Sequence, residues 1–210
     1  MKHLLAILLL SGSLFAADPI VLSLTDFTDA KGSPPPAGWV AEADGVIHRA
    51  AKAGDIISKK DYGSFEIEWE WKVAQGANSG LKYWVTSGPK SGLVGVEYQM
   101  IDDERHPDAK RGDSHNTASI YDIKGAAPDK AVKPAGEWNK SKVIVKDGIT
   151  QHFLNGKLAV EADTKADDWK QRIAKSKFGK MPGFAPGKGK VMLQDHGDEV
   201  WFKNIRVTAL

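Results

Sequence analysis

The stretch FEIEWEWKV, from Phe65 to Val73, decides the fold because two kinds of side chain alternate along it. Phe65, Ile67, Trp69, Trp71 and Val73 are apolar, and the residues between them are charged. Successive side chains of a β-strand point to opposite faces of the sheet, so this period of two predicts a half-buried strand. One face of that strand should lie in a hydrophobic core.

Other stretches predict strands on both sides of this one, separated by clusters of Gly, Asn, Asp and Pro. They are Gly80 to Thr86, Leu93 to Ile101, Lys142 to Lys146, Thr150 to Leu154, Val191 to Gln194 and Val200 to Thr208. The pairs Asp147-Gly148 and Asn155-Gly156 tolerate the positive φ angles of tight hairpin turns. Residues 142–160 are therefore predicted to form a meander of three antiparallel strands.

A single segment, Ala166 to Lys177, has helical spacing, with Trp169 and Ile173 behind two acids that suit a helix N-terminus. Many short strands with one helix predict an all-β fold, a two-sheet antiparallel β-sandwich or jelly roll with one short surface helix.

The N-terminal residues 1–17 have the layout of a secretory signal peptide: Lys2 and His3, an apolar run from Leu4 to Leu10, and small residues at Ala16 and Ala17. Residues 18–210 are then expected to form one exported domain, secreted or periplasmic. No stretch reaches the roughly 20 apolar residues of a membrane-spanning helix, so we expect no membrane insertion. The chain has no cysteine, which excludes disulfides and a thiol nucleophile.

The formal net charge of +2 provides no general attraction for nucleic acid, and no nucleic-acid partner is expected. Lysine-rich patches around residues 175–180 and 188–190 are interpreted as solvated surface. Phosphate loops, dinucleotide fingerprints and serine-hydrolase elbows are missing from the sequence, and no cofactor is required by it.

Two acidic clusters leave alternatives open. Asp102, Asp103, Glu104, His106 and Asp108 supply ligand types for a divalent metal, or form a polar loop whose acids cap backbone N–H groups. Glu66, Glu68 and Glu70 alternate like the catalytic acids of laminarinase-like glucanases, or form a solvated strand face. Glu70 is kept as a candidate cleft residue.

Five stretches together resemble the 3-keto-disaccharide hydrolase family. They are GDIISKKDYGSFEIEWEWK (54–72), GANSGLKYWV (76–85), GVEYQMIDDERHPD (95–108), ASIYDI (118–123) with GEWN (136–139), and LQDHGDEVWFKNIRV (193–207). The resemblance implies a concanavalin A-like β-sandwich, in agreement with the strand pattern, and action on glycosides oxidised at C3. An oligosaccharide or 3-keto-glycoside is then the expected partner.

Strand alternation places polar side chains on shared faces: Glu97 with Gln99, Lys82 with Trp84, and Gln194 with His196. Planar polar groups and an aromatic face are the usual chemistry of a sugar site. Together with the family resemblance, this pattern predicts Glu97, His196, Gln99 and Lys82 as catalytic, and Asn78, Trp84, Asp102, Gln194, Tyr121 and Glu70 as substrate-binding. Trp84 instead lies in the core if the strand phase differs by one residue, Tyr121 is alternatively a core residue with a tethered hydroxyl, and His196 alternatively organises a turn.

A ketone at C3 acidifies the C2 hydrogen, so a base and an oxyanion stabiliser allow elimination of the C1 substituent. Glu97 or His196 is the candidate base, and Lys82, Gln99 or a metal the candidate stabiliser. Direct hydrolysis would instead pair Glu97 with Asp102 or Glu70. A non-catalytic, lectin-like module is the alternative function, because fold does not fix function.

Overall fold

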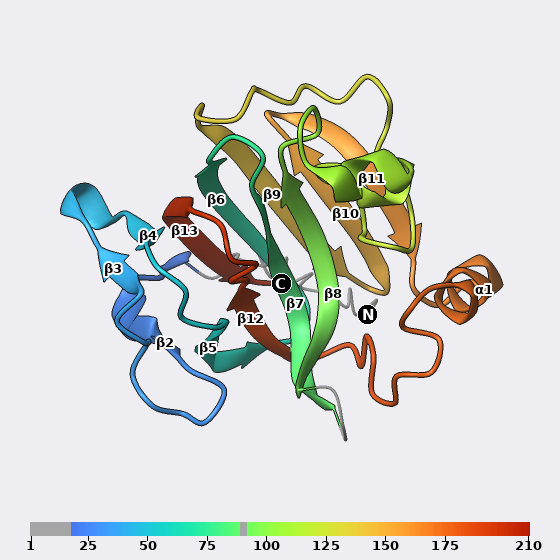
Figure 1. Cartoon of the computed structure of the whole chain (residues 1–210). Coiled ribbons are helices and arrows are strands. Elements are labelled where there is room, and N and C mark those ends of the chain that lie inside the picture. The colour runs from blue at the N-terminus through green and yellow to red at the C-terminus, as the bar shows by residue number, and fades with distance from the viewer. Residues whose placement is uncertain (1–17, 89–91) are drawn as a thin grey trace, which may run out of the picture.

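The structure, a computed structural model, describes residues 18–88 and 92–210 and has two antiparallel sheets packed face to face (Figure 1). The predicted signal peptide lies outside the described residues. The large sheet has the strand order β11-β10-β9-β6-β13-β4-β3, with β1 paired to β13, and the small sheet has the order β2-β5-β12-β7-β8. The predicted all-β sandwich is confirmed. No helix among the described residues has the length and apolar character needed to cross a bilayer.

The large sheet consists of β1 (Ile20–Val21), β3 (Trp39–Ala41), β4 (Ile47–Arg49), β6 (Phe65–Val73), β9 (Asn139–Lys146), β10 (Ile149–Leu154), β11 (Lys157–Asp163) and β13 (Val200–Ala209). The small sheet consists of β2 (Phe27–Thr28), β5 (Ile56–Tyr62), β7 (Asn78–Gly88), β8 (Gly92–Ile101) and β12 (Gly189–Leu193). Helix α1 (Asp167–Lys175) lies outside both sheets, as expected. Short 3₁₀ helices are η1 (Leu24–Asp26), η2 (Ala43–Gly45), η3 (Pro107–Arg111) and η4 (Asp113–His115).

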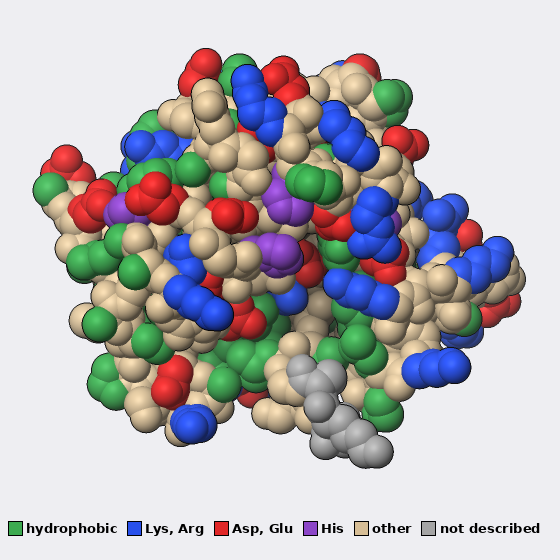
Figure 2. All heavy atoms as spheres, in the orientation of Figure 1, with side chains coloured by type: hydrophobic (Ala, Val, Ile, Leu, Met, Phe, Trp, Pro, Cys, Tyr) green, Lys and Arg blue, Asp and Glu red, His purple; other side chains and the backbone are tan. Residues whose placement is uncertain are grey.

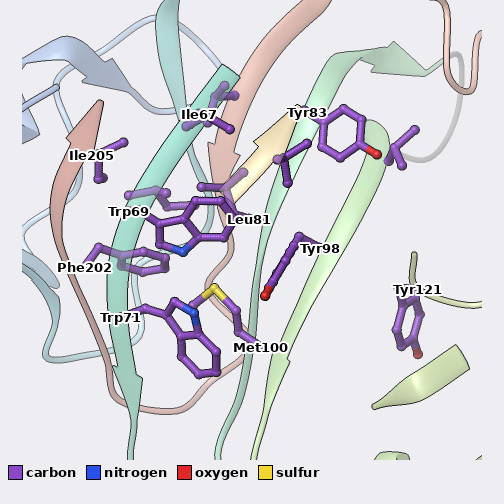
Figure 3. Packing of buried hydrophobic residues seen from close by; sticks show 14 of the residues in the cluster. Ile67, Trp69, Trp71, Leu81, Tyr83, Tyr98, Met100, Tyr121, Phe202 and Ile205 are labelled. Atoms are coloured by element: carbon purple, nitrogen blue, oxygen red, sulfur yellow. The ribbon is translucent and has the colours of Figure 1, made fainter. Parts of the chain in front are cut away.

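The core lies between the sheets and is built on the alternation of β6. Phe65, Ile67, Trp69 and Trp71 are at most 1% exposed, as predicted from the period of two. The Trp69 ring packs edge-on against Tyr98 of β8 at 4.9 Å between centroids, which joins the two sheets (Figure 3). Burial of each such side chain contributes about 1.5–3 kcal/mol.

The predicted meander is also confirmed, since β9, β10 and β11 pair in order. Asp147-Gly148 and Asn155-Gly156 all have positive φ, from 49° to 92°, which is the backbone of the tight turns that connect these strands.

Candidate functional site

The outer face of the small sheet, called the cleft face here, carries an ion pair at its centre. Lys82 of β7 and Glu97 of β8 are direct cross-strand partners, and Lys82 Nζ lies 3.2 Å from Glu97 Oε2. Their neighbours Leu81, Tyr83, Val96 and Tyr98 point into the core, so alternation turns this pair outward. The Glu97 side chain is only 3% exposed. Lys82 and Glu97, both predicted as site residues, thus form a largely desolvated ion pair. Figure 2 shows acidic, basic and histidine side chains on the face of the molecule that contains this pair.

Gly80 lies next to this pair and lets two longer side chains approach each other. It pairs with Gln99 on one side, and its carbonyl accepts the N–H of Gln194 at 3.0 Å on the other. A Cβ atom on Gly80 would lie 2.9 Å from Glu97 Oε1 and 3.2 Å from Gln194 Oε1. Glu97 and Gln194, two of the predicted site residues, therefore approach each other above this glycine.

Gln99 also points outward, but its amide is used within the fold. Its Oε1 accepts the N–H of Met100 at 3.1 Å, and its Nε2 donates to the carbonyl of His115 at 3.4 Å. The side chain is fully buried. Gln99 thus holds the segment that contains η4 against β8, a supporting position and not the exposed amide that was predicted.

Asp55, which precedes β5, is a cleft residue that the sequence analysis missed. Its Oδ1 accepts the N–H of Asp195 at 2.9 Å, and its charge interacts with those of Lys82 and Glu97. Burial raises the pKa of Asp55 above its usual value, and the nearby carboxylates of Asp195 and Glu97 add to the rise. Asp55 is therefore the carboxyl of this site best suited to carry a proton.

His196 lies in a turn that is fixed from both sides. The Asp195 carboxylate accepts the N–H groups of Ala53 and Gly54 and lies 2.7 Å from Arg49 Nε, and the pair of side chains is 3% exposed. Burial opposes ionisation of Asp195, but these donors outweigh it and lower its pKa. Asp198 accepts the backbone N–H of Asn78 at 3.0 Å. His196 lines an open hollow on the surface together with Lys52 and Gly54.

The loop after β8 contacts the Lys82–Glu97 region through Tyr121. Tyr121 donates its backbone N–H to the Glu97 carbonyl at 3.0 Å and its hydroxyl to Asp108 at 2.8 Å. Lys177 Nζ lies 4.1 Å from the centre of the Tyr121 ring. Burial lowers the pKa of Lys177, and its charge interacts with those of Glu97 and Lys82. Lys177 is exposed, as expected for the lysine-rich patch at 175–180, and its ammonium lies over the Tyr121 ring at the edge of this face.

Three predicted site residues lie elsewhere. Trp84 has a positive φ of 52° in a β-bulge, which turns its indole into the core, where Nε1 donates to the Gly63 carbonyl. Glu70 lies on the outer face of the large sheet, paired with Lys203 and Asn204. The Asp102 carboxylate accepts hydrogen bonds from the backbone N–H groups of Gly76, Glu104 and Arg105. Burial acts to raise the pKa of Asp102, but these hydrogen bonds outweigh it, so the pKa is lowered. Trp84 and Glu70 are therefore not cleft residues, and Asp102 shapes a turn.

Two amides of the cleft face retain unused hydrogen-bonding capacity. Asn78 Oδ1 and Gln194 Oε1 are buried and have no hydrogen-bond partner among the described residues. An unpaired buried acceptor costs free energy comparable to a lost hydrogen bond, so a group that donates to it is favoured. Hydroxyl-rich ligands supply such donors.

The acidic loop provides caps and ion pairs more than metal ligands. Asp103 accepts the Thr117 N–H and lies 3.1 Å from Lys130 Nζ, and Asp108 pairs with Arg111. His106, one of the residues predicted as possible metal ligands, lies instead near His196 and Asp198. Potential ligand atoms of these three residues lie within 4.8 Å of one another. This group is a second cluster of potentially reactive side chains, besides the Lys82–Glu97 pair.

Comparisons with known proteins identify the family of the chain. The family model described as a 3-keto-alpha-glucoside-1,2-lyase-like domain matches residues 22–208. A protein of Bacteroides thetaiotaomicron described as a 3-keto-disaccharide hydrolase is 38% identical in an alignment that covers 83% of this chain and 71% of the relative.

Two crystal structures from Parabacteroides distasonis, both described provisionally as glycosyl hydrolases, are also similar. The first has a TM-score of 0.80 and 36% identity and covers 90% of each chain. The second has a TM-score of 0.65 and 31% identity, and the match covers 82% of this chain and 90% of the other.

Proposed function

Because the chain belongs to the family of 3-keto-alpha-glucoside-1,2-lyase-like domains, we propose that this carbohydrate hydrolase cleaves the glycosidic bond of 3-keto-disaccharides and related 3-keto-glycosides. The observation that carries the proposal is the buried Lys82–Glu97 pair, which lies beside Gln194 and Asp55 on the cleft face. It combines proton-accepting, proton-donating and hydroxyl-binding groups in one place.

The reaction proposed is an elimination. Glu97 or His196 removes the C2 proton, and the electron pair moves to the C3 carbonyl oxygen to form an enolate. When the enolate collapses, a C1–C2 double bond forms and the C1–O bond breaks. The leaving oxygen takes a proton from Asp55, the carboxyl of this site whose pKa is raised by burial. Later addition of water to the unsaturated ketone gives the products of net hydrolysis.

Direct hydrolysis by two carboxyl groups is less well supported. The predicted partners of Glu97 were Asp102 and Glu70, and the first is bound by backbone N–H groups while the second lies on the other sheet. Asp55 is a different second carboxyl, whose charge interacts with that of Glu97. Elimination needs one base and one acid, which these residues supply.

The assay follows release of the leaving sugar from a 3-keto-disaccharide, with the unoxidised parent disaccharide as control. Replacement of the true base, by Glu97→Gln or His196→Ala, should lower turnover by about 10²–10⁴-fold while the sugar still binds. An unsaturated keto sugar should appear before the hydrated product. A lectin-like module would bind the same sugar and release nothing, and full activity of both variants would remove these residues from the chemistry.

Export of the mature chain is proposed from the N-terminal pattern of residues 1–17. Intact mass of protein from the native host tests it, since retention of Met1 would contradict cleavage.

A further inference from the structure

His106 lies at the start of η3 with one ring nitrogen already in use. Its Nδ1 accepts the backbone N–H of Asp108 at 3.1 Å and so caps this 3₁₀ helix. The ring is half-buried and meets the His196 ring edge-on, with 6.1 Å between centroids. No hydrogen bond joins His106 Nε2 to another residue in the described part of the chain.

This cap fixes the position of the ring proton. A backbone N–H can only donate, so Nδ1 must offer its lone pair and carry no hydrogen. The ring is then neutral, with its single proton on Nε2. Such a ring donates a hydrogen bond through Nε2, but it cannot transfer that proton, because an imidazolate would result.

The same cap bears on metal binding by His106, His196 and Asp198. Ligation through Nε2 needs a lone pair on that nitrogen, which requires the proton to move to Nδ1 and the bond from Asp108 to break. A ligating histidine usually donates its second N–H, whereas Nδ1 of His106 accepts. The geometry of His106 is thus that of a donor to a ligand oxygen.

We propose that His106 binds the C3 oxygen of the keto sugar through Nε2–H and stabilises the enolate as a neutral imidazole. The inference rests on the proposed function and adds the residue that holds the oxyanion. A neutral imidazole polarises a carbonyl without giving up a proton, so His106 ends the reaction as it began. Lys82 is already paired with Glu97, and the Gln99 amide is bound by backbone groups, which leaves this position unfilled.

The distance to His196 fits the chemistry. The C2 hydrogen and the C3 oxygen belong to adjacent carbons, so the base and the oxyanion donor must lie a few ångströms apart. His106 and His196 offer atoms within 4.8 Å of each other. The arrangement therefore places His196, one of the two candidate bases, beside the proposed oxyanion donor.

The first measurement is independent of turnover. In ¹⁵N-histidine-labelled protein treated with a chelator, His106 should show a protonated Nε2 and an unprotonated Nδ1, and its signals are assigned by their loss in His106→Asn. Addition of a 3-keto-glucoside should shift the Nε2–H signal. A proton on Nδ1, or no shift with saturating sugar, would overturn the assignment.

The second measurement uses two matched variants in the 3-keto-disaccharide assay. His106→Asn keeps a side-chain cap for Asp108 but lacks the reach of Nε2, so folding should be retained and kcat should fall about 10²–10³-fold. His106→Gln carries a longer amide N–H and should recover part of the loss. Full turnover of His106→Asn would overturn the inference while leaving the proposed function intact.

Treatment with a chelator distinguishes a hydrogen-bond donor role of His106 from a role as a metal ligand. Wild-type activity should survive removal of divalent ions, and the protein should hold no stoichiometric metal. Activity lost with the metal, together with metal content lost in His106→Asn, would show ligation instead. Wild-type protein inert toward every 3-keto-glycoside would refute the proposed function, whereas the tautomer and the shift on sugar binding would still report on His106.

Discussion

Gly80→Ala tests whether the position of the Glu97 carboxylate controls the reaction. Gly80 lies in β7 on the cleft face, and its φ is outside the left-handed region, so alanine can adopt its backbone. The added Cβ would lie 2.9 Å from Glu97 Oε1 and 3.1 Å from Glu97 Cγ. Because Cγ is affected as well as the carboxylate oxygen, rotation of the carboxylate alone does not relieve the contact.

The size of the effect follows from these distances. Ordinary van der Waals contact begins at 3.4 Å, so Glu97 must retreat by about half an ångström. The 3.2 Å contact with Lys82 should change with it. A misplacement of about 1 Å at a reacting group can cost about 10²-fold, so kcat should fall by about 10–100-fold. A strand-interior glycine is about 0.5–1 kcal/mol less favourable than alanine, which offsets the strain and leaves Tm nearly unchanged.

The assay compares kcat on a 3-keto-disaccharide with thermal melting of the same preparations. Gly63→Ala is the matched control, because a Cβ at Gly63 would meet only the Gly187 carbonyl oxygen, at 3.8 Å. It should leave both quantities unchanged. If Gly80→Ala folds normally and turns over at the wild-type rate, Glu97 is not positioned at the reacting centre and the argument fails.

Two further predictions concern charge. Burial raises the pKa of Asp55 in the folded state above its usual value of 3.8. The folded state therefore loses stability as the pH rises from about 3.8 through the higher folded pKa. Asp55→Asn should raise Tm at pH 7, change Tm little below pH 3.8, and slow turnover. Equal Tm differences at both pH values would contradict this. Arg49→Leu leaves buried Asp195 without its cation and should cost about 3–5 kcal/mol in denaturant unfolding, against about 0–1 kcal/mol for the exposed control Lys157→Met. Similar losses in the two variants would refute the burial argument.

The fold was predictable wherever a strand is long enough to show a period. β6 has nine residues, and its alternation gave the core face correctly. The hairpin turns at Asp147-Gly148 and Asn155-Gly156 were equally legible, because they need residues that accept positive φ. β1 to β4 have two or three residues each, too few for any periodicity, and their pairing depends on the rest of the sandwich.

The site was predictable only along regular strands. The phase of β8 placed Glu97 and Gln99 outward, but the bulge between Tyr83 and Thr86 reversed the direction of Trp84. A β-bulge inserts an extra residue into one strand of a pair, so the side chains beyond it no longer follow the simple alternation, and the sequence shows no periodic sign of it. Asp55 was missed because it reaches the cleft from a segment distant in the chain, and only the folded topology brings its charge near Glu97.

The way His196 is held favours catalysis over binding alone. Its two acidic neighbours are fixed independently: Asp195 by Arg49 and backbone N–H groups, and Asp198 by the N–H of Asn78. The Arg49–Asp195 pair is buried and links β4 of the large sheet to the turn that carries His196. Binding of a sugar tolerates small displacements of a surface histidine, whereas proton transfer needs its nitrogen held within about 0.5 Å. A turn secured to both sheets meets that stricter requirement.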